Sequence, residues 1–142
     1  KNISKGFIIS RGLGYALSTE ISLKFKELSL ELIEPFSSAE VMHGPKTLID
    51  DSLKLFILNL NDATGKNVKE GTKLFRQISD KIYFINSFEK DRNNFHFNST
   101  KIVEIDSILL MSKFYPMIIK YSMLKGINPD KPRYLSKITK TL

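Results

Sequence analysis

The 142-residue sequence carries a formal net charge of +7, and 42% of its residues are hydrophobic, which predicts one globular domain with a sizeable core. The sequence has no cysteine, and its two histidines, His43 and His96, lack ligand-type spacing, so disulfides and thiolate metal sites are excluded and a zinc site is not expected. The basic residues are scattered and no apolar run is long enough for a membrane span, so we expect an anionic small substrate rather than a nucleic-acid or membrane partner.

Apolar runs alternate with helical patterns along the first half of the chain. Residues 6–10 form a short apolar run that ends in a glycine turn, and a helical pattern follows over residues 16–33. The run at residues 53–60 is apolar almost throughout, as a strand covered on both faces must be. Residues 66–79 are predicted to form the second helix.

The second half continues this alternation. Residues 81–86 and 101–105 are predicted as strands, and the polar segment 88–99 between them is predicted as a loop. A last helix is expected over residues 107–125, with a kink at Pro116. Strands that alternate with helices predict an α/β fold, a doubly wound parallel sheet flanked by helices.

The first predicted helix carries two stripes of side chains at helical spacing. The apolar stripe consists of Leu17, Ile21, Phe25, Leu28 and Leu32. The charged stripe consists of Glu20, Lys24, Glu27 and Glu31. At about 100° per residue the charged stripe lies beside the apolar one rather than opposite it, which suggests a cleft or a subunit seam. On spacing alone, a solvated row of ion pairs such as Glu20–Lys24 is the more typical arrangement.

Three side chains stand out for their chemistry. Glu27 supplies a carboxylate, His43 an imidazole on a Gly-Pro turn, and Lys137 an amine in the tail. Together these groups suit proton transfer on a carbonyl compound such as an open-chain sugar. Taken singly, His43 and Lys137 are more typical of solvated surface positions. The turn at residues 11–14, Arg-Gly-Leu-Gly, either holds an anion at a helix N-terminus or is glycine-rich for steric reasons.

Two motifs make the chain resemble the second sugar-isomerase (SIS) domain of double-SIS phosphosugar enzymes. The first is Glu27 followed after fifteen residues by His43-Gly-Pro, and the second is Asp-x-Pro-Arg-x-Leu-x-Lys, which ends at Lys137. These enzymes include SIS-type glucosamine-6-phosphate deaminases, ketose/aldose isomerases and the isomerase half of glutamine–fructose-6-phosphate aminotransferase. The resemblance implies a flavodoxin-like three-layer sandwich, with the SIS domain at residues 1–126 and an extended tail of the same domain at residues 127–142.

The resemblance also implies roles for four residues. Glu27 would move the proton between C1 and C2 of the sugar, supported by Lys24. His43 would help to open the sugar ring and would be supplied by a neighbouring subunit. Lys137 would form a Schiff base with the ketose. No metal, nucleotide or redox cofactor is implied.

We therefore expect the C-terminal SIS domain of a phosphosugar isomerase or deaminase, which acts on hexose or amino-sugar 6-phosphates by aldose–ketose proton transfer. The alternatives are the isomerase domain of glutamine–fructose-6-phosphate aminotransferase and a regulatory SIS module that senses a sugar phosphate. The turn after the first strand lacks the family's serine-rich phosphate loop. We therefore expect a preceding SIS domain, a homodimer and little activity from this segment alone. A start without Met or a signal-peptide core predicts a piece of a longer, cytoplasmic protein.

Overall fold

The computed structural model describes residues 4–86 and 94–135. Within those residues it forms a parallel sheet in the order β2-β1-β3-β4-β5. The strands are β1 Lys5–Ser10, β2 Leu32–Ser37, β3 Lys54–Asn59, β4 Ile82–Asn86 and β5 Asn94–His96. The helices are α1 Leu13–Ser29, α2 Gly65–Phe75 and α3 Val103–Leu124, with the short 3-10 helices η1 Glu40–His43 and η2 Pro45–Leu48. The predicted doubly wound α/β fold is confirmed.

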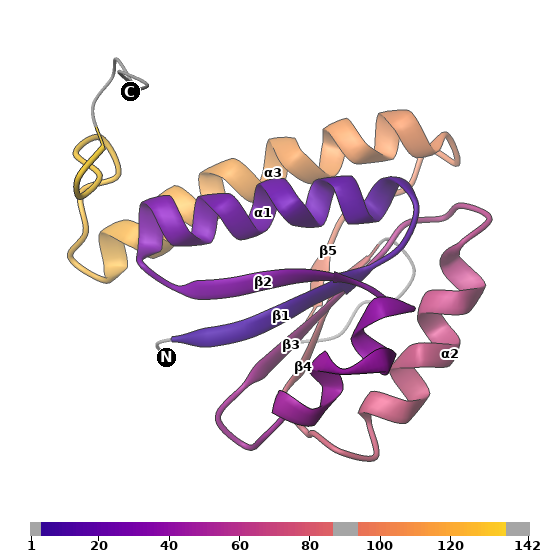
Figure 1. The fold of residues 1–142 in the computed structure, drawn as a ribbon. Coiled ribbons are helices and arrows are strands. Elements are labelled where there is room, and N and C mark those ends of the chain that lie inside the picture. The colour runs from indigo at the N-terminus through magenta and orange to yellow at the C-terminus, as the bar shows by residue number, and fades with distance from the viewer. Residues whose placement is uncertain (1–3, 87–93, 136–142) are drawn as a thin grey trace, which may run out of the picture.

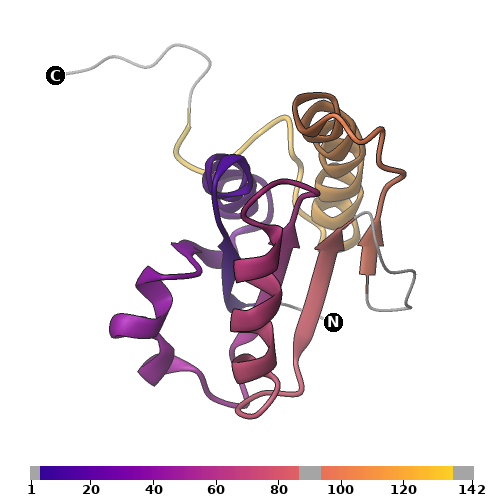
Figure 2. The same ribbon diagram turned by 90° about the vertical axis from the view of Figure 1, so that its right-hand side faces the viewer.

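Helices cover both faces of the sheet and give the molecule three layers (Figures 1 and 2). On one face α1 and α3 lie side by side, and Phe25 and Phe114 meet between them with ring centroids 5.8 Å apart. On the other face α2 packs with the η1–η2 segment, where Val41 and Phe75 belong to a second core cluster. Both cores are needed because β1 and β3, in the centre of the sheet, are buried on both sides.

Strand β2 was missed by the sequence prediction, which extended the first helix to residue 33. In the structure α1 ends at Ser29, and Leu30 turns the chain with a left-handed φ of 56°. A residue other than glycine rarely adopts this conformation, so no stop signal is visible in the sequence. Strand β2 also contains Pro35, which is tolerated because β2 is an edge strand of the sheet.

The prediction of a strand at residues 101–105 was wrong, because α3 already begins at Val103. Asp106, which is fully buried, accepts hydrogen bonds from the Ser99 hydroxyl at 2.5 Å and the Thr100 amide at 2.6 Å, and these bonds fix the start of α3. Burial disfavours the charge on Asp106, but the bonds from Ser99 and Thr100 outweigh it and lower the pKa of this carboxyl. The last strand, β5, instead lies within segment 88–99, which was predicted as a loop.

Candidate active site

Glu27 and Lys24 form a salt bridge on the outer side of α1. Lys24 Nζ lies 2.7 Å from Glu27 Oε2 and 3.6 Å from Glu20 Oε1, and the side chains of Lys24 and Glu27 are 23% and 28% exposed. The hydrogen bond to Glu27 raises the pKa of Lys24 above its ordinary value although partial burial opposes it. Lys24 therefore stays a cation through neutral pH. The pair presents a carboxylate to solvent with a fixed positive charge beside it.

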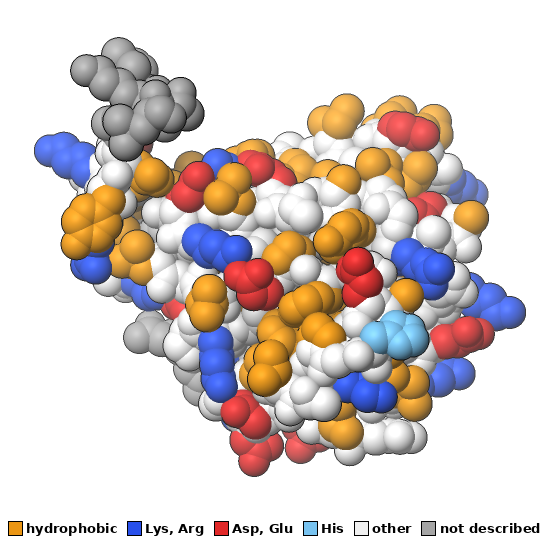
Figure 3. All heavy atoms as spheres, in the orientation of Figure 1, with side chains coloured by type: hydrophobic (Ala, Val, Ile, Leu, Met, Phe, Trp, Pro, Cys, Tyr) orange, Lys and Arg blue, Asp and Glu red, His pale blue; other side chains and the backbone are white. Residues whose placement is uncertain are grey.

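The rest of the charged stripe lies along the junction between α1 and α3. Tyr115 of α3 donates a hydrogen bond of 2.7 Å to Glu20, and this bond raises the pKa of the Tyr115 hydroxyl. Charged side chains alternate with apolar ones across the α1 face of the molecule (Figure 3). The Glu20–Lys24 ion pair expected from the spacing is present. The contact with Tyr115 was not predicted, because two residues 95 positions apart give no local signal in the sequence.

Glu31, the last member of the stripe, is a structural residue. It is 1% exposed and bonds to Lys125, while Tyr121 donates a hydrogen bond of 3.0 Å to the same oxygen. Burial raises the pKa of Glu31, but these bonds from Lys125 and Tyr121 outweigh it, so the pKa lies below its ordinary value. Lys125 also donates to the carbonyl of Ser29 at 2.7 Å. The cluster therefore ties the end of α1 to the end of α3.

His43 lies at the other end of α1 from Glu27. It closes η1, is exposed, and lines a shallow hollow together with Tyr15 and Phe36. Tyr15 sits in the first turn of α1 and Glu27 follows twelve residues later, so the two lie about 18 Å apart along the helix axis at about 1.5 Å per residue. The structure thus brings Lys24 and Glu27 together but not His43. Lys137 lies outside the described residues.

The glycine turn between β1 and α1 is filled by neighbouring side chains. Gly12 has a φ of 60°, and a Cβ added there would lie 3.0 Å from the Thr64 methyl and 3.3 Å from an Asp62 carboxylate oxygen. A Cβ on Gly14 would lie 2.3 Å from the Ser10 hydroxyl. The glycines therefore permit close packing, and the carboxylate of Asp62 opposes an anion at this turn. This geometry favours the steric interpretation of the turn.

The described ranges, 4–86 and 94–135, contain neither a metal-binding cluster nor a membrane-spanning helix. There, no three His, Asp or Glu side chains lie close enough together to hold a metal ion. In the same ranges, none of the helices combines the length and the apolar character needed to cross a lipid bilayer.

Comparison with known proteins finds relatives in sequence and neighbours in fold. No family model matches the chain. Glutamine–fructose-6-phosphate aminotransferase from Buchnera aphidicola is 32% identical over 135 residues, which are 91% of this chain and 22% of that protein. The chain therefore spans about a fifth of the length of this curated relative.

Solved structures of phosphosugar proteins share the fold. The C-terminal domain of glucosamine-fructose-6-phosphate aminotransferase from Francisella tularensis superposes with a TM-score of 0.73 at 19% identity, over 91% of this chain and 38% of that one. Tagatose-6-phosphate ketose/aldose isomerase from Escherichia coli gives a TM-score of 0.73 at 18% identity, over 95% and 40%. The parallel sheet and its flanking helices are therefore those of solved phosphosugar proteins, and the sequence is similar to part of an aminotransferase.

Proposed function

We propose that the chain is the C-terminal SIS domain of a longer phosphosugar isomerase or deaminase, a cytoplasmic enzyme that acts on hexose or amino-sugar 6-phosphates. The reaction is aldose–ketose proton transfer between C1 and C2. The observation that carries this proposal is the Glu27–Lys24 pair, joined at 2.7 Å on the solvent side of α1 in an SIS domain. The chain then comprises the SIS domain proper at residues 1–126 and its tail at residues 127–142.

The pair suits the chemistry of an enediol intermediate. Glu27 Oε2 is held by Lys24, so Oε1 is the oxygen that meets the substrate and carries the proton between the two carbons. A positioned carboxylate of this kind typically contributes on the order of 10²–10⁴-fold in rate. The Lys24 ammonium keeps positive charge beside the reacting carbons, where it stabilises the developing oxyanion. Proton transfer of this kind needs no redox cofactor.

The two remaining candidate residues complete the site from elsewhere. The position of His43, at the opposite end of α1, is consistent with an imidazole that serves the Glu27 of a neighbouring subunit in a homodimer. There it would move protons to and from the ring oxygen while the sugar opens. Lys137 in the tail would act near the carbonyl, as a Schiff-base amine or as a cation. The described part of the tail leaves the body of the domain (Figure 1), with Tyr134 97% exposed.

The outer face of α3 supports a preceding SIS domain of the same polypeptide as partner. This face bears apolar side chains at helical spacing, each more than a third exposed: Ile105, Ile108, Tyr115, Ile119 and Met123. An apolar strip of this kind is typical of a surface that another domain covers. The solved SIS structures are more than twice as long as the region this chain matches, which leaves room for a second domain in such proteins.

A second candidate function is the isomerase domain of a glutamine–fructose-6-phosphate aminotransferase. It is favoured by the 32% identity to the Buchnera aphidicola aminotransferase. Both candidates use Glu27 in the same proton transfer. They differ in what happens to nitrogen, which a deaminase releases and an aminotransferase adds. Ammonia release from glucosamine 6-phosphate supports the deaminase, and amide transfer from glutamine to fructose 6-phosphate supports the aminotransferase.

The test is Glu27→Gln in the full-length protein, assayed for turnover and KM separately. Glutamine keeps the shape and hydrogen bonding of the side chain but cannot act as a base, so we expect kcat to fall on the order of 10²-fold or more with a small change in KM. Glu34→Gln is the matched control, because Glu34 is also a carboxylate paired with a lysine of α1, with Lys26 Nζ at 2.8 Å. Its kcat should stay within about twofold. Near-normal turnover of Glu27→Gln would remove Glu27 from the mechanism and favour a sugar-phosphate sensor.

A further inference from the structure

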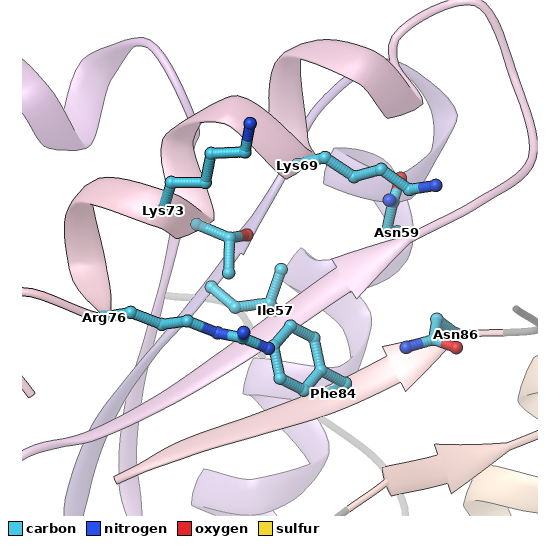
Figure 4. A pocket seen from close by; sticks show the side chains of 8 residues that line it. Ile57, Asn59, Lys69, Lys73, Arg76, Phe84 and Asn86 are labelled. Atoms are coloured by element: carbon cyan, nitrogen blue, oxygen red, sulfur yellow. The ribbon is translucent and has the colours of Figure 1, made fainter. Parts of the chain in front are cut away.

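A basic pocket lies on the sheet face opposite to the Glu27–Lys24 pair, between α2 and the strands β3 and β4 (Figure 4). Its volume is about 220 Å³. The lining residues are Ile57, Asn59, Lys69, Thr72, Lys73, Arg76, Phe84 and Asn86. Among these described lining residues three are basic and none is acidic, which suits an anion.

The register of the sheet explains how the floor of the basic pocket forms. In the parallel β3–β4 pair Ile57 is opposite Phe84 and Asn59 is opposite Asn86, so these four side chains point to the same face. The first pair gives an apolar floor. The second pair places two amides at the carboxyl ends of neighbouring strands, where open α/β sheets commonly bind ligands.

One wall of the basic pocket is a single side of α2. Lys69, Lys73 and Arg76 follow one another at intervals of four and three residues, and so lie along one side of the helix. The Arg76 guanidinium lies over the Phe84 ring, 5.3 Å from its centroid, which holds this cation against the floor. Figure 4 shows Lys69 extending above Asn59 at the other end of the pocket.

Asn59 has a buried oxygen without a partner. The residue is 5% exposed, its amide nitrogen donates weakly to the Gly65 carbonyl at 3.4 Å, and its Oδ1 accepts no hydrogen bond from any residue that the structure describes. A buried acceptor without a donor is costly, and in native proteins such groups are rare away from functional sites. Oδ1 itself has almost no accessible surface, so a ligand hydroxyl that displaces the atoms covering it and donates to it would remove this cost.

We propose that the basic pocket binds a small phosphorylated polyol, with its phosphate between Lys73 and Arg76 and one of its hydroxyls donating to Asn59 Oδ1. The phosphate matches the cations, and Arg76 can hold it with two parallel hydrogen bonds. The hydroxyl matches the unpaired Asn59 Oδ1. The volume lies below the range of about 300–1,000 Å³ typical of drug-sized sites, so the ligand is a monophosphate of a short polyol rather than a nucleotide. This site is separate from the proposed active site, which lies on the other face.

Calorimetric titration of the protein with glycerol 3-phosphate, methyl phosphate and inorganic phosphate tests the proposal. Lys73→Gln/Arg76→Gln should weaken the binding of all three probes about tenfold or more, because it removes both charges that face the phosphate. Lys113→Gln, which removes one charge from α3 on the opposite face, is the control and should leave binding within about twofold. Absence of glycerol 3-phosphate binding at millimolar concentration, or an equal loss in the control, would overturn the proposal.

The hydroxyl contact has its own test. Asn59→Leu is close in volume and lacks the orphaned oxygen, so it should abolish the preference for glycerol 3-phosphate over methyl phosphate while methyl phosphate still binds. If this variant does not fold, as judged by circular dichroism, Asn59→Ala, which also lacks a side-chain acceptor, serves the same purpose. An unchanged preference in the folded variant would show that Asn59 does not recognise a hydroxyl, and would contradict the proposal.

Discussion

Replacing Lys125 by methionine should lower the free energy of unfolding far more than an ordinary surface substitution does. Lys125 is the cation that compensates Glu31, and Glu31 is 1% exposed. Methionine has a similar length and fills the same space without a charge. The Tyr121 hydroxyl still donates to the carboxylate at 3.0 Å, but no positive charge remains beside it. Glu31 must then stay buried as an anion with neutral donors only, or take up a proton.

The expected cost is about 3–5 kcal/mol at pH 7, the range for removing one partner of a buried ion pair. Glu31→Gln should cost less, about 1–3 kcal/mol, because the Lys125 side chain is 17% exposed and can reach water. The double variant should be more stable than Lys125→Met alone, since no buried charge is left. The coupling energy between the two positions should then exceed the cost of Glu31→Gln alone.

Urea unfolding at pH 7 of the wild type, the two single variants and the double variant measures this coupling energy. The slope of the unfolding free energy against urea concentration shows whether each protein unfolds in two states. Acid titration gives an independent readout. The lowered pKa of Glu31 means that its stabilisation is present above the ordinary glutamate pKa and is lost as the pH falls through the lowered folded value. Lys125→Met should lack this acid-sensitive contribution. A cost below about 1 kcal/mol for Lys125→Met, or additive single changes, would refute a buried ionic tie between α1 and α3.

Three further predictions concern the start of α3, the end of α1 and the arrangement of subunits. Asp106→Asn should lower the free energy of unfolding by about 2 kcal/mol at pH 7, and this difference should shrink as the pH falls through the lowered folded pKa of Asp106. A difference that persists in acid would show that the charge of Asp106 does not strengthen its bonds to Ser99 and Thr100. Leu30→Gly should raise the free energy of unfolding by about 0.5–1 kcal/mol, because glycine adopts a φ of 56° without strain, and a loss of stability in the same urea assay would argue against strain at this turn. Glu27→Gln and His43→Ala subunits can be mixed in equal amounts, unfolded and reassembled together. The mixture should recover about a quarter of the wild-type turnover if each site takes its histidine from the neighbouring subunit. It should recover none if both residues come from one chain.

The parts of the fold that the sequence predicted well are those with strong local patterns. β1, β3 and β4 are short apolar runs covered on both faces, so composition alone identifies them. The end of α1 could not be located, because its stop signal is a leucine in a left-handed conformation. The alternation in residues 101–105 resembles a strand, and only the bonds that Ser99 and Thr100 make to Asp106 show that a helix begins there.

The candidate site divides in the same way. The spacing of Glu20 and Lys24 along one helix predicts an ion pair, and the pair is present at 3.6 Å. The partners that α3 supplies to Glu20 and Glu31 depend on how two helices pack, which no local pattern encodes. The basic pocket was missed for a related reason. Its wall comes from α2 and its orphaned amide from β3, so it exists only after the chain has folded.

The central claim, that Glu27 carries a proton between C1 and C2 of a sugar phosphate, is tested most directly by isotope exchange. Fructose 6-phosphate is incubated with the full-length protein in D₂O, without an added nitrogen source, and deuterium at C1 is followed by NMR. Wild-type protein and Glu34→Gln should incorporate deuterium at similar rates, while Glu27→Gln should be slower on the order of 10²-fold or more. Equal exchange by Glu27→Gln and wild-type protein would contradict the account.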